Sequence, residues 1–209
     1  LRKDEVVGFY HFNTATYVRL WLSASGMNGM KFDWKDPLGN SRFHGESKYE
    51  NEMLTSFDDT RNRLLNSDKQ FTPTEILSFE QKEYELLQVS QAFSQEFRDF
   101  MKKDVQYFWL YFRQKQGHSI EGKATSEVFE DVQALKSRNY FYFLYEYFSR
   151  ESVDLKTKYR NVQQRLKNRQ VREAYWAFDL HEESTKEKVD FDIIEQYYLF
   201  EKSVSTPGF

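Results

Sequence analysis

Histidine and carboxylate side chains are the groups in this chain that could hold a metal ion. The four histidines are His11, His44, His118 and His181. Metal-dependent chemistry needs several ligands that converge on one point, and helical di-iron bundles carry Glu-x-x-His on two helices. No histidine here follows a glutamate at that spacing. The sequence therefore predicts no metal site and no cofactor, and we expect His118, in a glycine turn, to lie on the surface.

Catalytic and phosphate-binding motifs are also missing from the sequence. Its glycines do not have the spacing of a Walker or dinucleotide loop, and neither Gly-x-Ser-x-Gly nor His-Glu-x-x-His occurs. Carboxylate pairs such as Asp58 and Asp59 are adjacent in the chain, so on a helix they diverge. There is no cysteine, which excludes thiolate chemistry and Cys-type zinc sites. The sequence therefore predicts no catalytic residue and favours a protein that is not an enzyme.

Basic residues are concentrated between residues 156 and 172, on both sides of an apolar stripe from Leu155 to Leu166. A cation-rich amphipathic helix can bind a phosphate backbone, an anionic lipid or an acidic partner helix. The simpler interpretation, which we favour, is that long basic side chains shield the edges of a buried seam. The net charge of −3 likewise favours no anionic partner overall. The candidate basic patch consists of Lys158, Arg165, Arg169 and Arg172.

Aromatic residues make up 18% of the chain and form two blocks, 107–112 and 140–145. Each block is apolar on every side, so the helix that carries it must be enclosed. Enclosure within the chain is the default; surplus faces would instead bind a protein partner or a second copy. An aromatic-lined pocket for a small apolar ligand is a third alternative. The candidate interface residues are Tyr107, Trp109, Tyr111, Tyr142 and Tyr145.

Long helices must position these residues, because only three prolines and eight glycines interrupt 209 residues. The clearest helix start is 72–75, where Thr72 and Glu75 can form a capping box around Pro73. Apolar residues then recur at helical spacing as far as Gly117, which predicts a helix of more than about forty residues if it is unbroken. Glu83, Ser90 and Asp104 interrupt the apolar seam, and a kink or a change of packing partner is expected near one of them. Further helices are expected over the ranges 46–66, 125–150, 153–180 and 189–200.

The first 45 residues are less regular. Residues 5–25 fit either a helix or a strand, and we favour a helix because the rest of the chain is helical. Residues 26–45 are rich in turn-forming residues and predict a long loop, in which 30–34 alternate as a short strand would. Because long loops are often functional, a site there with His11 or His44 is an alternative hypothesis.

Together these patterns predict an all-α protein: an elongated bundle of five to six helices with one long central helix and a less regular N-terminal region. We divide it into residues 1–45, a helix or hairpin plus loop packed on the bundle, and residues 46–209, the aromatic-rich bundle. The expected function is a non-enzymatic interaction or regulatory module that binds a protein partner or itself through aromatic helix faces. Ligand binding or catalysis near 26–45 is the first alternative. Nucleic-acid or membrane contact through 156–172 is the second.

The sequence does not decide the compartment, and the cytoplasm is the favoured expectation. No apolar run approaches the ~18 residues that span a bilayer. The chain starts at Leu1 with Arg2 and Lys3, which is compatible with a membrane tether upstream of Leu1. An arbitrary boundary at this residue is the simpler interpretation.

Overall fold

A computed structural model describes residues 8–12, 16–21, 31–33, 42–44, 47–89, 92–120, 122–123, 125–152 and 154–184. Its helices are α1 (Lys48–Leu65), α2 (Pro73–Val89), α3 (Gln95–Lys115), α4 (Ser126–Phe129), the 3-10 helix η1 (Val132–Lys136), α5 (Arg138–Glu151), α6 (Leu155–Arg165) and α7 (Arg169–Ser184). The strands are β1 (Gly8–Phe12), β2 (Thr16–Leu20), β3 (Lys31–Asp33) and β4 (Arg42–His44).

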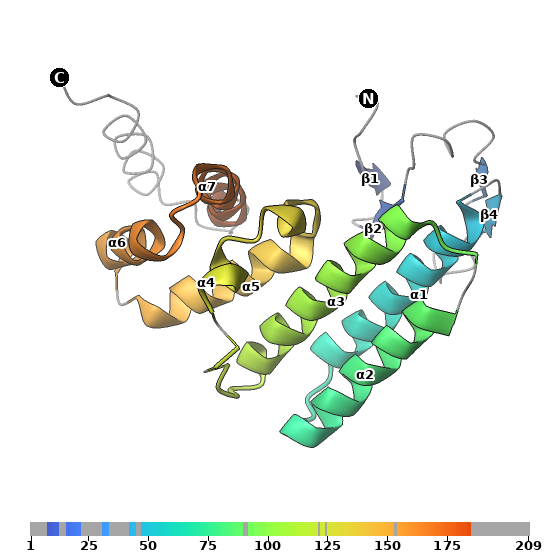
Figure 1. The fold of residues 1–209 in the computed structure, drawn as a ribbon, viewed down its shortest axis with the longest axis horizontal. Coiled ribbons are helices and arrows are strands. Elements are labelled where there is room, and N and C mark those ends of the chain that lie inside the picture. Colours follow the sequence, from blue (N-terminus) through green and yellow to red (C-terminus); the bar gives the residue numbers. More distant parts are fainter. Residues whose placement is uncertain are drawn as a thin grey trace.

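The predicted all-α bundle is confirmed, and α3 is its central helix. Figure 1 shows α1, α2 and α3 side by side, with α4 to α7 on the other side of α3. At 21 residues α3 is the longest helix described. The described residues form seven α-helices, slightly more than predicted, because several expected helices are divided.

The N-terminal region contains two short hairpins. β1 pairs with β2 in antiparallel register, Gly8 opposite Leu20, so the helix favoured for 5–25 is wrong. The β-branched and aromatic residues of 16–20 prefer extended backbone, and this preference prevails over the helical spacing. β3 pairs with β4, Lys31 opposite His44, within the region expected to be a loop. Both β2 and β4 lie against α1.

Helix α2 begins with the predicted capping box. The Thr72 N–H donates to Glu75 Oε2 at 2.8 Å, and the Glu75 N–H donates to Thr72 Oγ1 at 3.3 Å. The predicted continuous helix is wrong, since α2 ends at Val89 and α3 begins at Gln95. Ser94 caps α3 by accepting from the Phe97 N–H, and its own N–H and hydroxyl donate to Glu50 of α1. The apolar spacing continues across the break because α2 and α3 pack against each other and contribute their apolar faces to the same hydrophobic cluster.

The two later helices that the sequence predicted are also divided. The range 125–150 contains α4, η1 and α5, and the range 153–180 contains α6 and most of α7. Asp154 caps α6 by accepting from the Thr157 N–H at 2.7 Å. The Asn168 side chain accepts from the N–H groups of Gln170 and Val171 and starts α7. Because such caps act locally, a new helix can begin at Asp154 or Asn168 although the apolar spacing of the sequence shows no interruption there. The predicted helix over 189–200 lies outside the described residues.

Helices α3 and α5 run parallel to each other. Ring centroids are 4.5 Å apart for Tyr107 and Tyr140 and 5.6 Å apart for Tyr111 and Tyr142, and Lys115 pairs with Glu146. Residue numbers thus rise together along both helices, so α3 and α5 do not form an antiparallel hairpin. The segment between them returns along α3 before α5 begins. The two aromatic blocks therefore meet.

Two hydrophobic clusters share α3. The first includes Phe108, Trp109 and Phe112 and gathers side chains of α1, α2 and α3. The second includes Tyr107 and Leu110 and gathers side chains of α3 to α7. The block 107–112 is therefore enclosed on both sides within the chain, which explains why it has no polar face.

Candidate ligand-binding cleft

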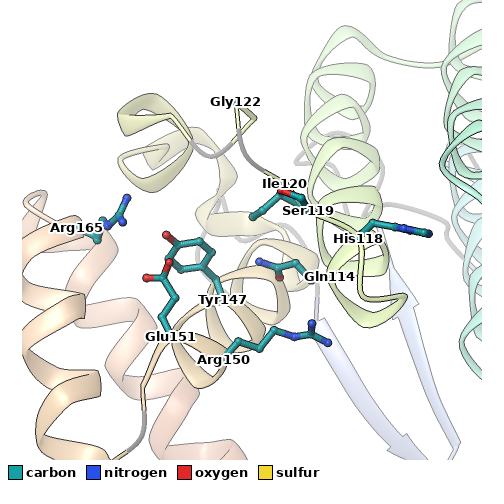
Figure 2. Close-up of a pocket in the computed structure, with 9 residues that line it drawn as sticks. All are labelled: Gln114, His118, Ser119, Ile120, Gly122, Tyr147, Arg150, Glu151 and Arg165. Carbon is teal, nitrogen blue, oxygen red and sulfur yellow. The ribbon is translucent and has the colours of Figure 1, made fainter.

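The parallel arrangement of α3 and α5 places their carboxyl ends together, and a cleft opens there. Its volume is about 440 Å³, and Figure 2 shows the residues around it. α3 contributes Gln114, α5 contributes Tyr147, Arg150 and Glu151, and α6 contributes Arg165. Residues of the turn after α3 form another wall, namely His118, Ser119, Ile120 and Gly122. Positive φ angles of 76° at Gly117 and 78° at Gly122 shape this turn.

Gln114 presents an unsatisfied amide oxygen at the cleft. The residue is only 4% exposed, and its Oε1 has no hydrogen-bond partner among the described residues. Figure 2 shows the amide directed into the space bounded by Tyr147 and Arg150. Leaving a buried polar atom unpaired costs about 1–3 kcal/mol, so a ligand that donates to this oxygen would recover that energy.

Tyr147 and Glu151 lie one turn apart on α5, and their side chains are joined by a hydrogen bond. Figure 2 shows the Tyr147 hydroxyl beside the Glu151 carboxylate. Burial and, next, the hydrogen bond with Glu151 raise the pKa of Tyr147 to about 12. The phenol therefore keeps its proton at neutral pH and serves as a donor rather than as a base. The ring of Phe129, 4.9 Å away between centroids, holds Tyr147 in place.

Two arginines flank this pair. The Arg150 Nε donates to Glu146 Oε1 at 2.7 Å, which leaves its terminal nitrogens without an acceptor among the described residues. The Arg165 guanidinium lies 5.6 Å from the centre of the Phe129 ring and 5.7 Å from that of Tyr147, and forms no ion pair with any described residue. Two cationic groups and one carboxylate, Glu151, thus border the cleft.

His118 lies in the wall of the cleft, but its imidazole ring does not face the cleft. Its Nε2 lies 2.6 Å from the Phe71 carbonyl oxygen, and Figure 2 shows the ring turned away from the other labelled side chains. It is half-buried, more enclosed than the sequence suggested. The histidine therefore attaches the turn to the segment before α2 and does not reach a ligand in the cleft.

The structure places the candidate interface residues in two environments. Tyr107 and Trp109 are 0% and 1% exposed, so they are interior residues and not surface contacts, because α3 is enclosed from both sides. Tyr111, Tyr142 and Tyr145 are half-buried. Tyr111 stacks on Tyr142, and the rings of Tyr142 and Tyr145 lie near Phe178 of α7. Only these three could contact another molecule in the conformation described.

The candidate basic residues are dispersed rather than gathered in a patch. Lys158 is buried, with its Nζ 2.6 Å from Asp179 Oδ1. Arg169 pairs with Glu173 at 2.5 Å, and Arg172 donates to the Leu166 carbonyl at 2.9 Å. The break between α6 and α7 separates these side chains, and only Arg165 of the four reaches the cleft.

Sequence reasoning missed four of the five principal cleft residues, namely Gln114, Tyr147, Arg150 and Glu151. The spacing of Tyr147 and Glu151 places them on one helix face, but such pairs are common and do not by themselves indicate a site. The side chains of His11 and His44, and most of the loop 26–45, lie outside the described residues. Within the described part no three His, Asp or Glu side chains could hold a metal ion, and no helix there is long and apolar enough to cross a membrane.

Comparison of the chain with protein-family models, curated proteins and solved structures finds no match.

Proposed function

We propose that this protein is a non-enzymatic helical domain that binds a small polar molecule in the cleft between α3, α5 and α6. The observation that carries the proposal is the buried, unpartnered Oε1 of Gln114. A volume of about 440 Å³ also lies within the usual range for small-molecule sites, about 300–1,000 Å³. The protonated Tyr147 and the averted His118 support binding rather than acid–base catalysis.

Side-chain amide NMR tests this proposal directly. A library of small polar fragments is titrated into the ¹⁵N-labelled protein while the Gln114 side-chain NH₂ resonance is followed. Fragments that bind should shift this resonance, because the amide borders the cleft. The variant Gln114→Leu keeps the side-chain size and should lose binding while retaining its helical circular dichroism. The matched control is Gln81→Leu, an exposed position on α2, which should bind like the parent protein.

A library in which no compound shifts the Gln114 resonance would rule the proposal out. Equal binding by Gln114→Leu and the parent protein would place the ligand elsewhere on the surface and reject it as well.

We also propose, as a second candidate function, that the protein binds a second copy of itself through half-buried aromatic rings of α3, α5 and α7. Phe178 lies 5.5 Å from Phe141 and 5.3 Å from Tyr142 between ring centroids, and Tyr111 stacks on Tyr142. Aromatic groups with one exposed edge are enriched at protein interfaces, which supports binding of a second copy here. Light scattering after size-exclusion chromatography should then show a dimer that Tyr142→Ser weakens. A monomer at all accessible concentrations would contradict this second proposal.

A further inference from the structure

The two arginines of the cleft lie at its opposite ends, and the groups between them are neutral. Figure 2 shows Arg165 at one end and Arg150 at the other, with Tyr147 and Gln114 between them. Burial is the main cause that raises the pKa of Tyr147 to about 12, so its hydroxyl is uncharged at neutral pH and donates to Glu151. A ligand in the middle of the cleft therefore meets a neutral amide and a neutral phenol rather than a counterion. Because a charge without a counterion is costly to remove from water, this environment favours an uncharged molecule.

The Gln114 amide is the polar group that the middle of the cleft offers to a ligand. The residue is 4% exposed, and its Oε1 accepts no hydrogen bond from any described residue. A side-chain amide also carries N–H donors on Nε2, in the same plane as Oε1. It therefore presents an acceptor and a donor side by side. Its complement is a group that has one donor and one acceptor at the same spacing.

Two largely apolar side chains border the same space. Ile120, in the turn after α3, and the Tyr147 ring, on α5, both line the cleft. Figure 2 shows that they approach it from different segments of the chain. Phe129 packs against Tyr147, with 4.9 Å between the ring centroids, and limits the movement of that ring. An aliphatic side chain and a fixed aromatic ring around one space suit a flat apolar body.

We infer that the ligand of this cleft is a small, neutral, planar molecule with an amide whose N–H and C=O point to the same side, as in a primary carboxamide or a lactam. The ligand N–H donates to Gln114 Oε1, and the ligand carbonyl accepts from Gln114 Nε2. An open-chain secondary amide does not form this pair, because its N–H and C=O point in opposite directions. The inference rests on the proposed function and names the class of molecule for the same site.

A matched series of compounds tests the inference on the unmodified protein. Benzamide represents the carboxamides and 2-pyridone the lactams. N-Methylbenzamide, N,N-dimethylbenzamide and 1-methyl-2-pyridone keep the ring and the carbonyl but lose the N–H on the carbonyl side, and benzoate has a charge in place of the amide. Each compound is titrated by calorimetry and by the Gln114 side-chain NH₂ resonance. Benzamide or 2-pyridone should bind at least about tenfold more tightly than its methylated forms and than benzoate, because only the unmethylated amides pair with both ends of the Gln114 amide.

Replacement of Gln114 by Glu should change which compound binds best. A carboxylate accepts two parallel N–H bonds from an amidinium group, so Gln114→Glu should bind benzamidine at least about tenfold more tightly than benzamide. The unmodified protein should show the reverse order. Gln81→Glu, at an exposed position on α2, is the matched control and should keep the order of the unmodified protein. The compound series requires no variant, so it decides the inference even where Gln114→Glu does not fold.

The outcomes separate this inference from the proposed function. Methylated amides or benzoate that bind as tightly as the unmethylated amides would overturn the inference, and so would a folded Gln114→Glu variant that still prefers benzamide. If neither benzamide nor 2-pyridone binds but other fragments shift the Gln114 resonance, the cleft is still a binding site and the amide class is wrong. If no compound shifts that resonance, the inference and the proposed function both fail.

Discussion

The Arg61 guanidinium on α1 donates from Nη1 to Asp104 Oδ2 on α3 at 2.6 Å, in the interior of the bundle. Its Nε and Nη2 also donate to the two carboxylate oxygens of Glu83 on α2, at 3.1 and 2.8 Å. The exposed fractions of Arg61, Glu83 and Asp104 are 2%, 6% and 0%. These three residues, the buried ion cluster, therefore join α1, α2 and α3 with almost no exposure to solvent.

Neutral donors complete this cluster. The Trp109 indole N–H donates to Glu83 Oε2 at 2.8 Å, and the Ser137 hydroxyl donates to Asp104 Oδ1 at 2.8 Å. Since Ser137 precedes α5, the cluster connects the first three helices to the start of the second group. Saturation of the carboxylate oxygens by donors is what allows such charges to remain buried.

Replacement of Arg61 by Leu should strongly destabilise the fold. The variant would leave two buried carboxylates without their counterion, and such losses typically cost about 3–5 kcal/mol. Urea unfolding followed by circular dichroism would measure the change in the free energy of unfolding. Arg63→Leu, at an exposed position on the same helix, should change it by less than about 0.5 kcal/mol. Equal stability of the two variants would mean that the cluster does not hold the helices together.

Replacement of Asn51 by Ala should release the segment at Trp21 from the bundle. The Trp21 N–H donates to Asn51 Oδ1 at 2.7 Å, and Asn51 Nδ2 donates to the Trp21 carbonyl at 3.0 Å. Without them two buried backbone groups lose their partners, at a cost of about 1–3 kcal/mol. Hydrogen exchange at the Trp21 amide should accelerate accordingly. Asn62→Ala, exposed on α1, is the control and should leave this exchange rate unchanged.

The two hydrophobic clusters should unfold in one transition, because α3 belongs to both. Leu54 lies in the first cluster and Phe143 in the second, and both are 0% exposed. Leu54→Ala should cost about 2–5 kcal/mol and Phe143→Ala about 3–5 kcal/mol. Calorimetry should show each variant with a single peak at a lower midpoint, whereas Tyr49→Ala, at a position 57% exposed, should barely move it. Two separate peaks, only one of which moves in each variant, would show that the clusters fold independently.

Alkaline pH should destabilise the protein through its enclosed tyrosines. Burial is the main cause that raises the pKa of Tyr84, Tyr111 and Tyr147 from 10.0 to about 12. The unfolded chain loses these protons near pH 10 while the folded protein retains them. This contribution to stability is therefore complete below pH 10 and is lost as the pH rises toward 12.

Urea midpoints measured at pH 9, 10 and 11 would show this decline, and absorbance at 295 nm would report the ionisation of tyrosine. Tyr147→Phe should make the decline shallower, whereas Tyr49→Phe, at an exposed position, should not. Midpoints that stay constant from pH 9 to 11 would refute the prediction.

The sequence alone determined the features that arise from short-range chemistry. The capping box of Thr72 and Glu75 and the helical character after residue 47 were predictable because caps and spacing act within a few residues. The absence of any polar face required residues 107–112 to be enclosed, but only the structure showed that the chain itself encloses them. The break between α2 and α3 lies next to Ser90, one of three polar seam positions at which the sequence predicted a kink or a change of partner. The spacing did not select among the three and did not predict the break at Asn168, because apolar periodicity continues across a break when both parts pack on one core.

Only the tertiary structure decided which distant side chains meet. The parallel course of α3 and α5 brings Gln114 to Tyr147, and no local signal in the sequence distinguishes a parallel from an antiparallel arrangement of these two helices. Folding likewise buried Lys158 against Asp179 and left Arg165 at the cleft, although both belong to the same basic stretch. Charge and hydrogen bonding depend on separations of a few ångströms, and contacts between helices far apart in the chain set those separations.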